Sequence, residues 1–176
     1  MPDPDTFTLG HGTRPLNELV ATLREASVTT LVDVRRFPGS RRNPQFGRER
    51  LAAAVEEAGI LYRHEPELGG RRRDEAGEDR FGCIRVVAFR SYAARMTTPP
   101  WQSALASALD APSPPCFLCA ETAWTRCHRR LIADLLTARR HEVLHLLGPG
   151  RSQAHRLWDV AEIRRGRLYL CGEFVA

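Results

Sequence analysis

The sequence contains no lysine: all 26 of its Lys and Arg residues are arginine, in a chain of 176 residues with a net charge of +5. This absence excludes a lysine that forms a Schiff base, and it excludes the lysine-containing phosphate loop of many nucleotide hydrolases. A composition biased toward arginine also makes positive charge a poor guide to nucleic-acid binding. Only arginines that a motif places at a site therefore carry functional weight.

Long apolar runs are also absent. No stretch approaches the roughly 18–20 apolar residues of a membrane span, and the acidic segment Met1–Asp5 lacks the basic-then-apolar pattern of a signal peptide. The five cysteines are an odd number, without the spacing of a small secreted disulfide framework. We therefore expect a cytoplasmic protein with reduced thiols and no membrane association.

The remaining sequence alternates short apolar runs with helical periodicity. Strands are predicted at Thr6–Gly10, Thr29–Val34, Ile60–His64, Cys116–Ala120 and Glu142–Leu147. Helices are predicted at Leu16–Leu23, Leu51–Ala58, Ile84–Met96 and Pro100–Leu109, with a fifth starting at Cys127. This alternation predicts a single α/β domain over residues 1–176, with a mainly parallel sheet of about five strands flanked by helices in Rossmann-like layering.

Two details of this prediction concern element ends. Thr13 is the candidate N-cap of the first helix, with Pro15 in its first turn. The tail, Gly150–Ala176, is expected to form a short helix and an edge strand at Leu168–Cys171.

The residues with the most reactive side chains follow the carboxyl ends of the predicted strands. Parallel strands bring these ends to one edge of the sheet, where α/β proteins bind ligands. The candidates are His11 after the first strand, Asp33, Arg35, Arg41 and Arg42 at and after the second, and Cys119, Glu121, Cys127, His128 and Arg129 at and after the fourth. We expect them to form one pocket.

Cys127 is the stronger candidate for a reactive thiol. If Thr125 caps the helix, Cys127 lies in its first turn beside cationic side chains, and both the helix dipole and those charges lower a thiol pKa. Cys119 lies nearer the expected ligand position, but the spacing from Cys119 to Arg126 is too long for a phosphatase or sulfurtransferase loop, and Glu121 would repel an anion. The alternative for each cysteine is a buried, inert side chain, and this alternative is favoured for Cys83, Cys116 and Cys171.

A metal site is the next interpretation, because Cys116, Cys119, Cys127 and His128 offer four ligands. The residues between the first two cysteines favour a strand, on which positions i and i+3 face opposite sides. Adjacent side chains in a helix, as expected at Cys127 and His128, also diverge. We therefore expect no metal ion and no other cofactor.

Several residues keep two interpretations. Asp33 and Arg35 form either a structural salt bridge or an acid–base group and an anion clamp. His11, between two glycines, is either structural or a donor to a ligand. Arg41 and Arg42 lie in a segment stiffened by Gly and Pro, which favours preorganised phosphate contacts.

The aromatic and acid–base groups after the fourth strand are also ambiguous. His128 could act as a general acid or base if Glu121 orients it. Trp124 could stack on a base or shield the core.

These residues together resemble the domain-of-unknown-function family 488. The resemblance rests on Thr8–Thr13, Leu31–Phe46, Pro66–Gly70, Cys119–Glu121 and Cys127–Arg129, with Tyr92, Met96 and His155 also similar. It implies an α/β fold and a cluster of the strand-end histidine, aspartate, arginines, cysteines and glutamate, without an established reaction. Gly12 and Thr122–Trp124 depart from the pattern, since relatives usually carry a serine at the first position and a more polar, proline-containing stretch at the second.

The leading hypothesis is a small α/β protein whose pocket binds an anionic ligand, a nucleotide or a nucleic-acid end, with hydrolytic or transfer chemistry. The alternative is a non-catalytic nucleic-acid-binding module that uses an arginine-rich surface. The two differ in salt dependence, which is steep for a surface that binds phosphates.

Overall fold

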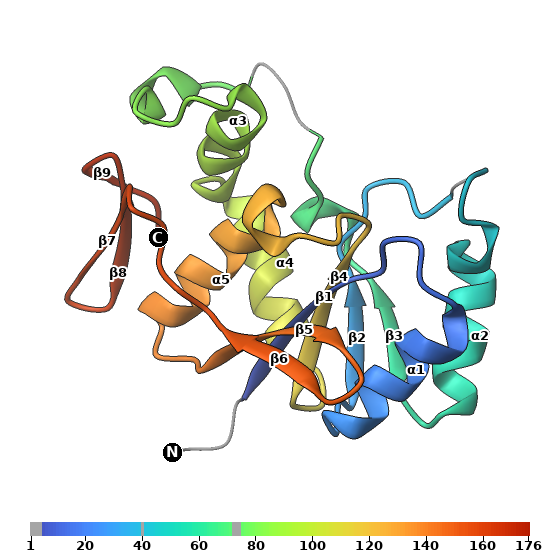
Figure 1. Cartoon of the computed structure of the whole chain (residues 1–176). Coiled ribbons are helices and arrows are strands. Elements are labelled where there is room, and N and C mark those ends of the chain that lie inside the picture. Colours follow the sequence, from blue (N-terminus) through green and yellow to red (C-terminus); the bar gives the residue numbers. More distant parts are fainter. Residues whose placement is uncertain (1–4, 40, 72–74) are drawn as a thin grey trace.

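The computed structural model describes residues 5–39, 41–71 and 75–176, and its core is a six-stranded sheet with strand order β3-β2-β4-β1-β5-β6 (Figure 1). All neighbouring strands pair in parallel except β5 and β6, which pair antiparallel. The predicted α/β class and mainly parallel sheet are confirmed. The sheet has one strand beyond the five expected, the antiparallel edge strand β6.

The elements have these bounds. The strands are β1 (Thr6–Gly10), β2 (Thr30–Asp33), β3 (Leu61–His64), β4 (Pro115–Cys119), β5 (Val143–Gly148), β6 (Arg151–Ala154), β7 (Ala161–Arg164), β8 (Arg167–Leu170) and β9 (Glu173–Phe174). The α-helices are α1 (Leu16–Glu25), α2 (Arg48–Glu57), α3 (Val87–Met96), α4 (Pro99–Leu109) and α5 (Arg129–Ala138). Short 3₁₀ turns cover Pro44–Phe46, Pro66–Leu68, Glu78–Phe81 and Trp124–Arg126.

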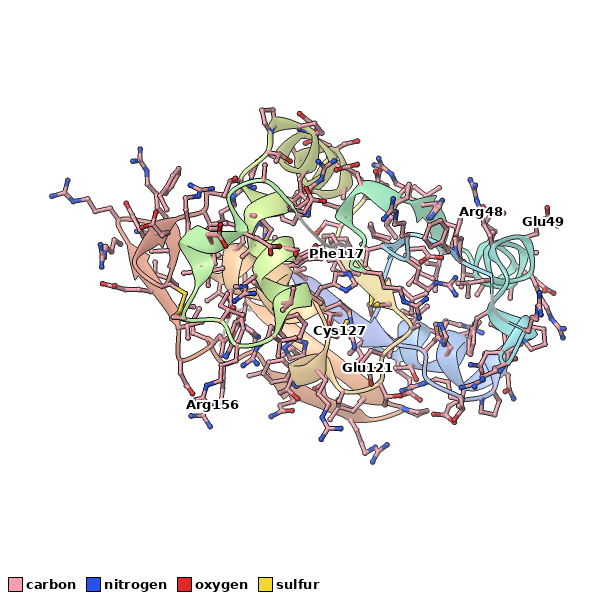
Figure 2. The ribbon with its side chains drawn as sticks, turned by 90° about the horizontal axis from the view of Figure 1, so that it is seen from above. Arg48, Glu49, Phe117, Glu121, Cys127 and Arg156 are labelled. Atoms are coloured by element: carbon pink, nitrogen blue, oxygen red, sulfur yellow. A yellow bond between two sulfur atoms is a disulfide. The ribbon has the colours of Figure 1, made fainter. Side chains whose placement is uncertain are left out.

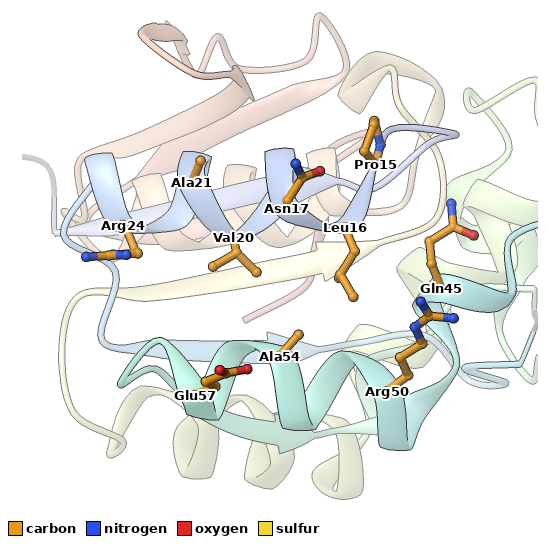
Figure 3. Close-up of a pocket in the computed structure, with 10 residues that line it drawn as sticks. All are labelled: Pro15, Leu16, Asn17, Val20, Ala21, Arg24, Gln45, Arg50, Ala54 and Glu57. Carbon is orange, nitrogen blue, oxygen red and sulfur yellow. The ribbon is translucent and has the colours of Figure 1, made fainter.

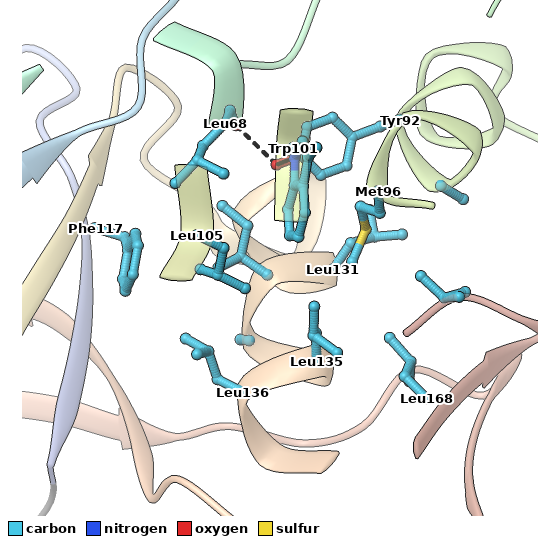
Figure 4. Close-up of a cluster of buried hydrophobic side chains, with 14 of the residues drawn as sticks. Leu68, Tyr92, Met96, Trp101, Leu105, Phe117, Leu131, Leu135, Leu136 and Leu168 are labelled. Carbon is cyan, nitrogen blue, oxygen red and sulfur yellow. Dashed lines mark hydrogen bonds between the residues drawn. The ribbon is translucent and has the colours of Figure 1, made fainter. Parts of the chain in front are cut away.

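Helices cover both faces of the sheet and create two apolar clusters. Helices α1 and α2 pack on one face, through residues such as Leu19 and Leu51. Helices α3, α4 and α5 pack on the other, around Trp101 and Leu131 (Figure 4). Strands β1, β2 and β4 are buried along their whole length, as their apolar sequences require of strands covered on both faces.

Strand β4 illustrates the alternation between the faces. Cys116 belongs to the cluster under α1 and α2, whereas Cys119 belongs to the cluster under α3–α5. The prediction that these two side chains face opposite sides is confirmed. Cys119 is the member of the pair that lies at the carboxyl end of the strand.

The start of helix α1 differs from the prediction at Thr13. Pro15 is the N-cap residue, no side chain caps the helix, and the Leu19 amide donates to the Pro15 carbonyl. The left-handed conformation of Gly12, with φ of +55°, turns the chain before Thr13, so the threonine lies outside the helix and is exposed.

The start of helix α5 also differs, with larger consequences for the site. The predicted cap, Thr125, lies inside the 3₁₀ turn Trp124–Arg126, and the Cys127 amide donates to the Trp124 carbonyl. Cys127 therefore has extended backbone (φ −121°, ψ 146°), and the helix begins at Arg129. The prediction that Cys127 lies in the first helical turn is wrong. Helix α3 likewise begins at Val87, three residues later than predicted.

In the tail, the strand predicted at Leu168–Cys171 is present as β8 (Arg167–Leu170), but it is not an edge strand, and strands take the place of the predicted short helix. Strand β8 is the middle strand of an antiparallel sheet with order β7-β8-β9, and Leu168 and Leu170 join the core against α5. None of the helices in the described ranges combines the length and apolar character that a membrane crossing requires.

Cys83 and Cys171 form a disulfide between the segment before α3 and the turn after β8. The expectation that these two cysteines are inert, reduced side chains is therefore wrong, because the fold of the tail brings together residues 88 positions apart. Cys116, Cys119 and Cys127 remain free and buried.

Candidate functional site

A cavity of about 780 Å³ lies at the carboxyl ends of the central strands. The loops after β1, β2 and β4 form its walls, together with Gly70, Arg71 and the first turns of α3. The connection from β1 leads to α1 on one face of the sheet, and the connection from β4 leads to α5 on the other. A crevice opens where loops from neighbouring strands turn to opposite faces, so the position of the predicted pocket follows from the topology.

Cys119, Cys127 and His128 meet at this cavity. The Cys127 Sγ lies 3.6 Å and the Cys119 Sγ lies 3.9 Å from Nδ1 of His128. The three side chains are nearly buried, with at most 9% of their surface exposed. Figure 2 looks onto this end of the sheet, with Cys127 near the middle of the molecule.

The pKa values of the two thiols shift in opposite directions. The hydrogen bond with Cys127, followed by burial, raises the pKa of Cys119. Burial opposes ionisation of Cys127, but the hydrogen bond from Cys119 and the nearby His128 and Arg129 together lower its pKa. By contrast, burial raises the pKa of Cys116, which lies on the far face of the sheet. The prediction that Cys127 is the more acidic thiol is thus retained, although the cause is its neighbours and not a first-turn position.

Arg129 lies behind the cavity, with 1% of its surface exposed. Its Nε donates to the Cys127 Sγ at 3.4 Å, its Nη1 to the Thr8 hydroxyl at 3.2 Å, and its Nη2 to the Glu121 carbonyl at 2.6 Å. Every nitrogen of the guanidinium thus has a protein partner. Arg129 was predicted to bind the ligand; the geometry instead makes it a residue that positions the thiol and the loop after β4.

A chain of buried polar side chains continues from Arg129 to the edge of the sheet. Nδ1 of His145 lies 2.7 Å from the Thr8 hydroxyl, its Nε2 lies 2.9 Å from Nδ1 of His155, and Nε2 of His155 lies 2.8 Å from Asp134. One placement of the protons satisfies every contact when Asp134 is ionised and both imidazoles are neutral. In it, the Thr8 hydroxyl donates to His145, His145 donates to His155, and His155 donates to Asp134. Thr8 then accepts from Arg129, so this network fixes the orientation of the arginine.

Asp33 and Arg35 form a buried, bidentate salt bridge. Arg35 Nε and Nη2 donate to the two carboxylate oxygens at 2.8 and 2.6 Å, and the Tyr62 hydroxyl donates to the same carboxylate at 2.7 Å. Among the described residues, those that border the cavity include Arg35 but not Asp33. The geometry therefore favours the salt bridge, one of the two interpretations left open by the sequence, over a catalytic acid–base role for Asp33.

His11 holds Arg35 from the opposite side. The imidazole stacks on Phe46, its Nδ1 lies 2.8 Å from the Gly12 carbonyl, and its Nε2 lies 3.3 Å from Nη1 of Arg35. Since arginine only donates, Nε2 is the acceptor and Nδ1 carries the proton. Burial lowers the pKa of His11 to about 4, consistent with a neutral ring that orients Arg35 and does not bind an anion through charge.

The rim of the cavity carries the exposed cations. Arg41 and Arg42 border the cavity as predicted, and Arg36, Arg71 and Arg126 join them. Sequence reasoning missed these three because an arginine in a lysine-free chain carries no signal unless its loop is placed. Phe37 was missed as well; it is 66% exposed at the rim, with the Arg36 guanidinium 5.3 Å from its ring centroid.

Two residues of the loop after β4 have clear positions. Glu121 is exposed and borders the cavity, and it makes no hydrogen bond to His128 among the described contacts, so the orienting role suggested for it is not seen. Trp124 is 7% exposed, stacks on His145 with ring centroids 4.0 Å apart, and donates to Gln153. Of the two roles considered for Trp124, the geometry supports shielding of the core.

A family model described as a domain of unknown function, DUF488, matches residues 15–136, well over half of the chain. The protein belongs to the DUF488 family. The match includes the Asp33–Arg35 pair, the arginine rim, Cys119 and Cys127, and it ends before His145 and His155. No curated protein and no solved structure matches the chain.

Glycines let the backbone approach the site at two positions where this DUF488 protein would not accept a side chain. A Cβ at Gly70 would lie 2.6 Å from Nδ1 of His128, so the backbone there packs directly on the imidazole. A Cβ at Gly12 would lie 2.3 Å from the Thr122 hydroxyl. Thr122 therefore fills the space that a side chain at position 12 would need.

A second cavity of about 700 Å³ lies between α1 and α2, on the outer side of the sheet (Figure 3). Its walls include Val20, Arg24, Ala54 and Glu57, and it contains none of the thiols or imidazoles. Its position away from the strand ends leaves the first cavity as the candidate site in this DUF488 protein.

Proposed function

We propose that the cavity binds a phosphate-bearing ligand, a nucleotide or a nucleic-acid end, and supports hydrolytic or transfer chemistry beside Cys119, Cys127 and His128. The observation that carries this proposal is the charge of the rim. Within the described ranges 5–39, 41–71 and 75–176, five exposed arginines border the cavity, and Glu121 is the one bordering carboxylate. Guanidinium groups donate to phosphate oxygens in pairs, which suits them to this ligand.

The size and the aromatic rim favour a nucleotide over a bare phosphate. A volume of about 780 Å³ is within the usual range for small-molecule sites. Phe37 offers an exposed ring beside Arg36 at the cavity mouth, and Phe89 also borders the cavity. Bases stack on such rings without sequence preference. The rim thus provides partners for both the phosphate and the base.

The inner end of the cavity holds the groups capable of reaction. The cavity is bordered there by Cys119, Cys127 and His128. Both sulfur atoms lie within 3.9 Å of Nδ1 of His128. A ligand whose phosphate is held by Arg41, Arg42 and their neighbours therefore presents its inner bonds to these groups. Arg35 and Arg129, both held by internal hydrogen bonds, support the walls.

The alternative, a binding module that uses a general arginine surface, makes a different prediction for matched variants. Arg41→Gln with Arg42→Gln removes two rim charges, and Arg164→Gln with Arg165→Gln removes an adjacent pair on the remote small sheet. We expect the first variant to lose at least about tenfold in affinity for a nucleoside monophosphate or a 5′-phosphorylated oligonucleotide, whereas the second stays close to the parent protein.

Isothermal titration calorimetry at two salt concentrations measures both outcomes. The surface-binding alternative would be favoured if both variants lost affinity equally and if the affinity for oligonucleotide fell steeply between about 50 and 200 mM salt. Retention of full affinity in the Arg41/Arg42 variant would overturn the proposal.

We also propose a cytoplasmic location, where Cys119 and Cys127 stay reduced. The disulfide between Cys83 and Cys171 is the exception to this environment. Alkylation of thiols in intact cells, followed by mass spectrometry, measures the oxidation state of Cys119 and Cys127. The location is supported if both thiols are free and contradicted if both are oxidised.

A further inference from the structure

We propose that Cys119, Cys127 and His128 bind one zinc ion, with the fourth coordination position open to the cavity. Among the residues that the structure describes, this is the one group of three or more Cys, His, Asp or Glu side chains whose donor atoms converge, all within 4.8 Å of one another. The inference goes beyond the proposed function, and the existence of the site does not depend on it.

The distances match those that zinc imposes. Bonds of about 2.3 Å to sulfur and about 2.0 Å to nitrogen, at tetrahedral angles, place a sulfur and a nitrogen ligand about 3.6 Å apart. The sulfur-to-Nδ1 distances are 3.6 Å for Cys127 and 3.9 Å for Cys119. Both sulfur-to-nitrogen distances are thus close to those of a tetrahedral zinc site, and all three donor atoms lie within 4.8 Å of one another.

The sequence argued against zinc for a reason that the backbone removes. Cys127 and His128 were expected to diverge as neighbours on a helix, but Cys127 is extended and outside α5. The bend between the extended residue and the helix turns the two side chains toward Cys119. Cys116, the ligand that the strand geometry excluded, takes no part, because it lies on the other face of the sheet.

The surroundings of the cluster suit a metal site that exchanges a ligand. Arg129 donates to the Cys127 sulfur, the kind of outer contact that fixes a ligating side chain. The His128 ring is held by packing, between the Gly70 backbone and the Tyr92 ring at a centroid distance of 4.9 Å. Two thiolates balance the charge of Zn²⁺, so the occupied site is neutral in its buried position.

Three protein ligands leave one position for water or substrate, which distinguishes catalytic from structural zinc. All three ligands border the cavity, so this position faces the arginine rim. If the proposed function holds, a water molecule bound to the ion would lie beside the phosphate-bearing ligand. Zinc lowers the pKa of such a water to about 7, which favours a hydrolytic reaction.

The test measures metal and nucleotide separately on the full chain. In the first experiment, the protein is loaded with zinc and desalted, and elemental mass spectrometry measures the zinc content per chain. In the second, the protein is loaded with Co²⁺, whose charge-transfer absorption with thiolates reports sulfur ligands. We expect about one metal ion per chain and this absorption. The matched control Cys83→Ser with Cys171→Ser should keep both, whereas Cys119→Ser and Cys127→Ser should each lose the absorption or reduce it.

A positional variant guards against misfolding of the cysteine variants. Gly70→Ala places a methyl group against His128 without replacing a ligand, so the affinity for zinc should fall at least about tenfold. At Gly82 a Cβ meets nothing closer than 3.4 Å, so Gly82→Ala should leave the affinity for zinc unchanged. Wild-type protein that retains no metal after loading, or a cobalt spectrum without thiolate absorption, would overturn the inference. Nucleotide affinity of the Arg41/Arg42 variant tests the proposed function independently, because that variant keeps all three ligands.

Discussion

Arg129 donates from its Nε to the sulfur of Cys127 across 3.4 Å, and this contact joins the core of the protein to its cavity. The other two nitrogens of the same guanidinium hold the Thr8 hydroxyl of β1 and the Glu121 carbonyl of the loop after β4. One buried side chain therefore links strand β1, the loop after β4 and the Cys127 thiol.

The substitution Arg129→Lys tests this arrangement. An ammonium group keeps the charge but cannot reach three partners that lie in a planar fan, so we expect the free energy of unfolding to fall by about 1.5–3 kcal/mol for the charged hydrogen bonds lost. Urea denaturation measures the change, with the exposed Arg156→Lys as control (Figure 2). Equal stability of the two variants would show that Arg129 does not have the role assigned to it.

The Asp33–Arg35 salt bridge predicts a larger loss. Asp33→Asn leaves a buried guanidinium without its counter-charge and replaces one of the two acceptor oxygens shared by Arg35 and Tyr62 with a donor, so we expect a destabilisation of about 3–5 kcal/mol. Thermal and urea unfolding should both report it. Arg164→Gln breaks the exposed pair with Glu162 and should leave stability unchanged. If the Asp33→Asn protein is stable but has lost the proposed hydrolytic or transfer activity, the catalytic interpretation of Asp33 is supported instead.

His145 predicts the direction of the acid dependence. Burial, followed by the nearby His155 and Arg129, lowers the pKa of His145 to about 3. Cys127 acts in the opposite direction, and His155 is itself hydrogen-bonded to Asp134. In the unfolded chain, the imidazole gains a proton near pH 6.5, whereas in the folded protein it stays neutral. Stability should therefore fall as pH decreases from about 6.5, and the loss contributed by His145 should be complete near pH 3.

The variant His145→Asn isolates this contribution. We expect the free energy of unfolding between about pH 4 and 6 to depend less steeply on pH in the variant, by up to about 1.4 kcal/mol per pH unit. Urea denaturation at a series of pH values gives the slope. A slope identical to that of the parent protein would mean that His145 is protonated in the folded state as readily as in the unfolded chain.

The disulfide between Cys83 and Cys171 predicts a response to reductant. The crosslink spans 88 positions, and its reduction should destabilise the protein by about 2–4 kcal/mol. The melting temperature should fall on reduction in the parent protein and stay constant in Cys83→Ser with Cys171→Ser. Thiol titration of the denatured, unreduced protein should find the three free cysteines and not five. A count of five would contradict the crosslink.

The sheet and the position of the site could be predicted because parallel strands leave a simple signal. Strands β2 and β4 are buried on both faces, so their sequences are short, continuous apolar runs, and the residues after them must meet at one edge. The family resemblance, now confirmed by the match to residues 15–136, rests on these same strand ends.

The details inside the site depend on local backbone choices that the sequence leaves open. Thr125 is a good helix cap by type, yet the 3₁₀ turn Trp124–Arg126 ends in an extended Cys127, and this single difference turns two diverging side chains into converging ones. The contact of His145 with His155 requires the antiparallel pairing of β5 and β6, and the disulfide requires the fold of the tail. Neither interaction has a local sequence signal.

The most direct test of the central claim locates the ligand on the molecule. In a titration of ¹⁵N-labelled protein with adenosine monophosphate, we expect saturable chemical-shift changes at the amides that border the cavity, including Gly12, Gly39 and Gly70, and none in the small sheet around Arg164. Shift changes spread over the exposed arginines, or no change at the cavity amides under saturating nucleotide, would contradict the assignment of this cavity as the binding site.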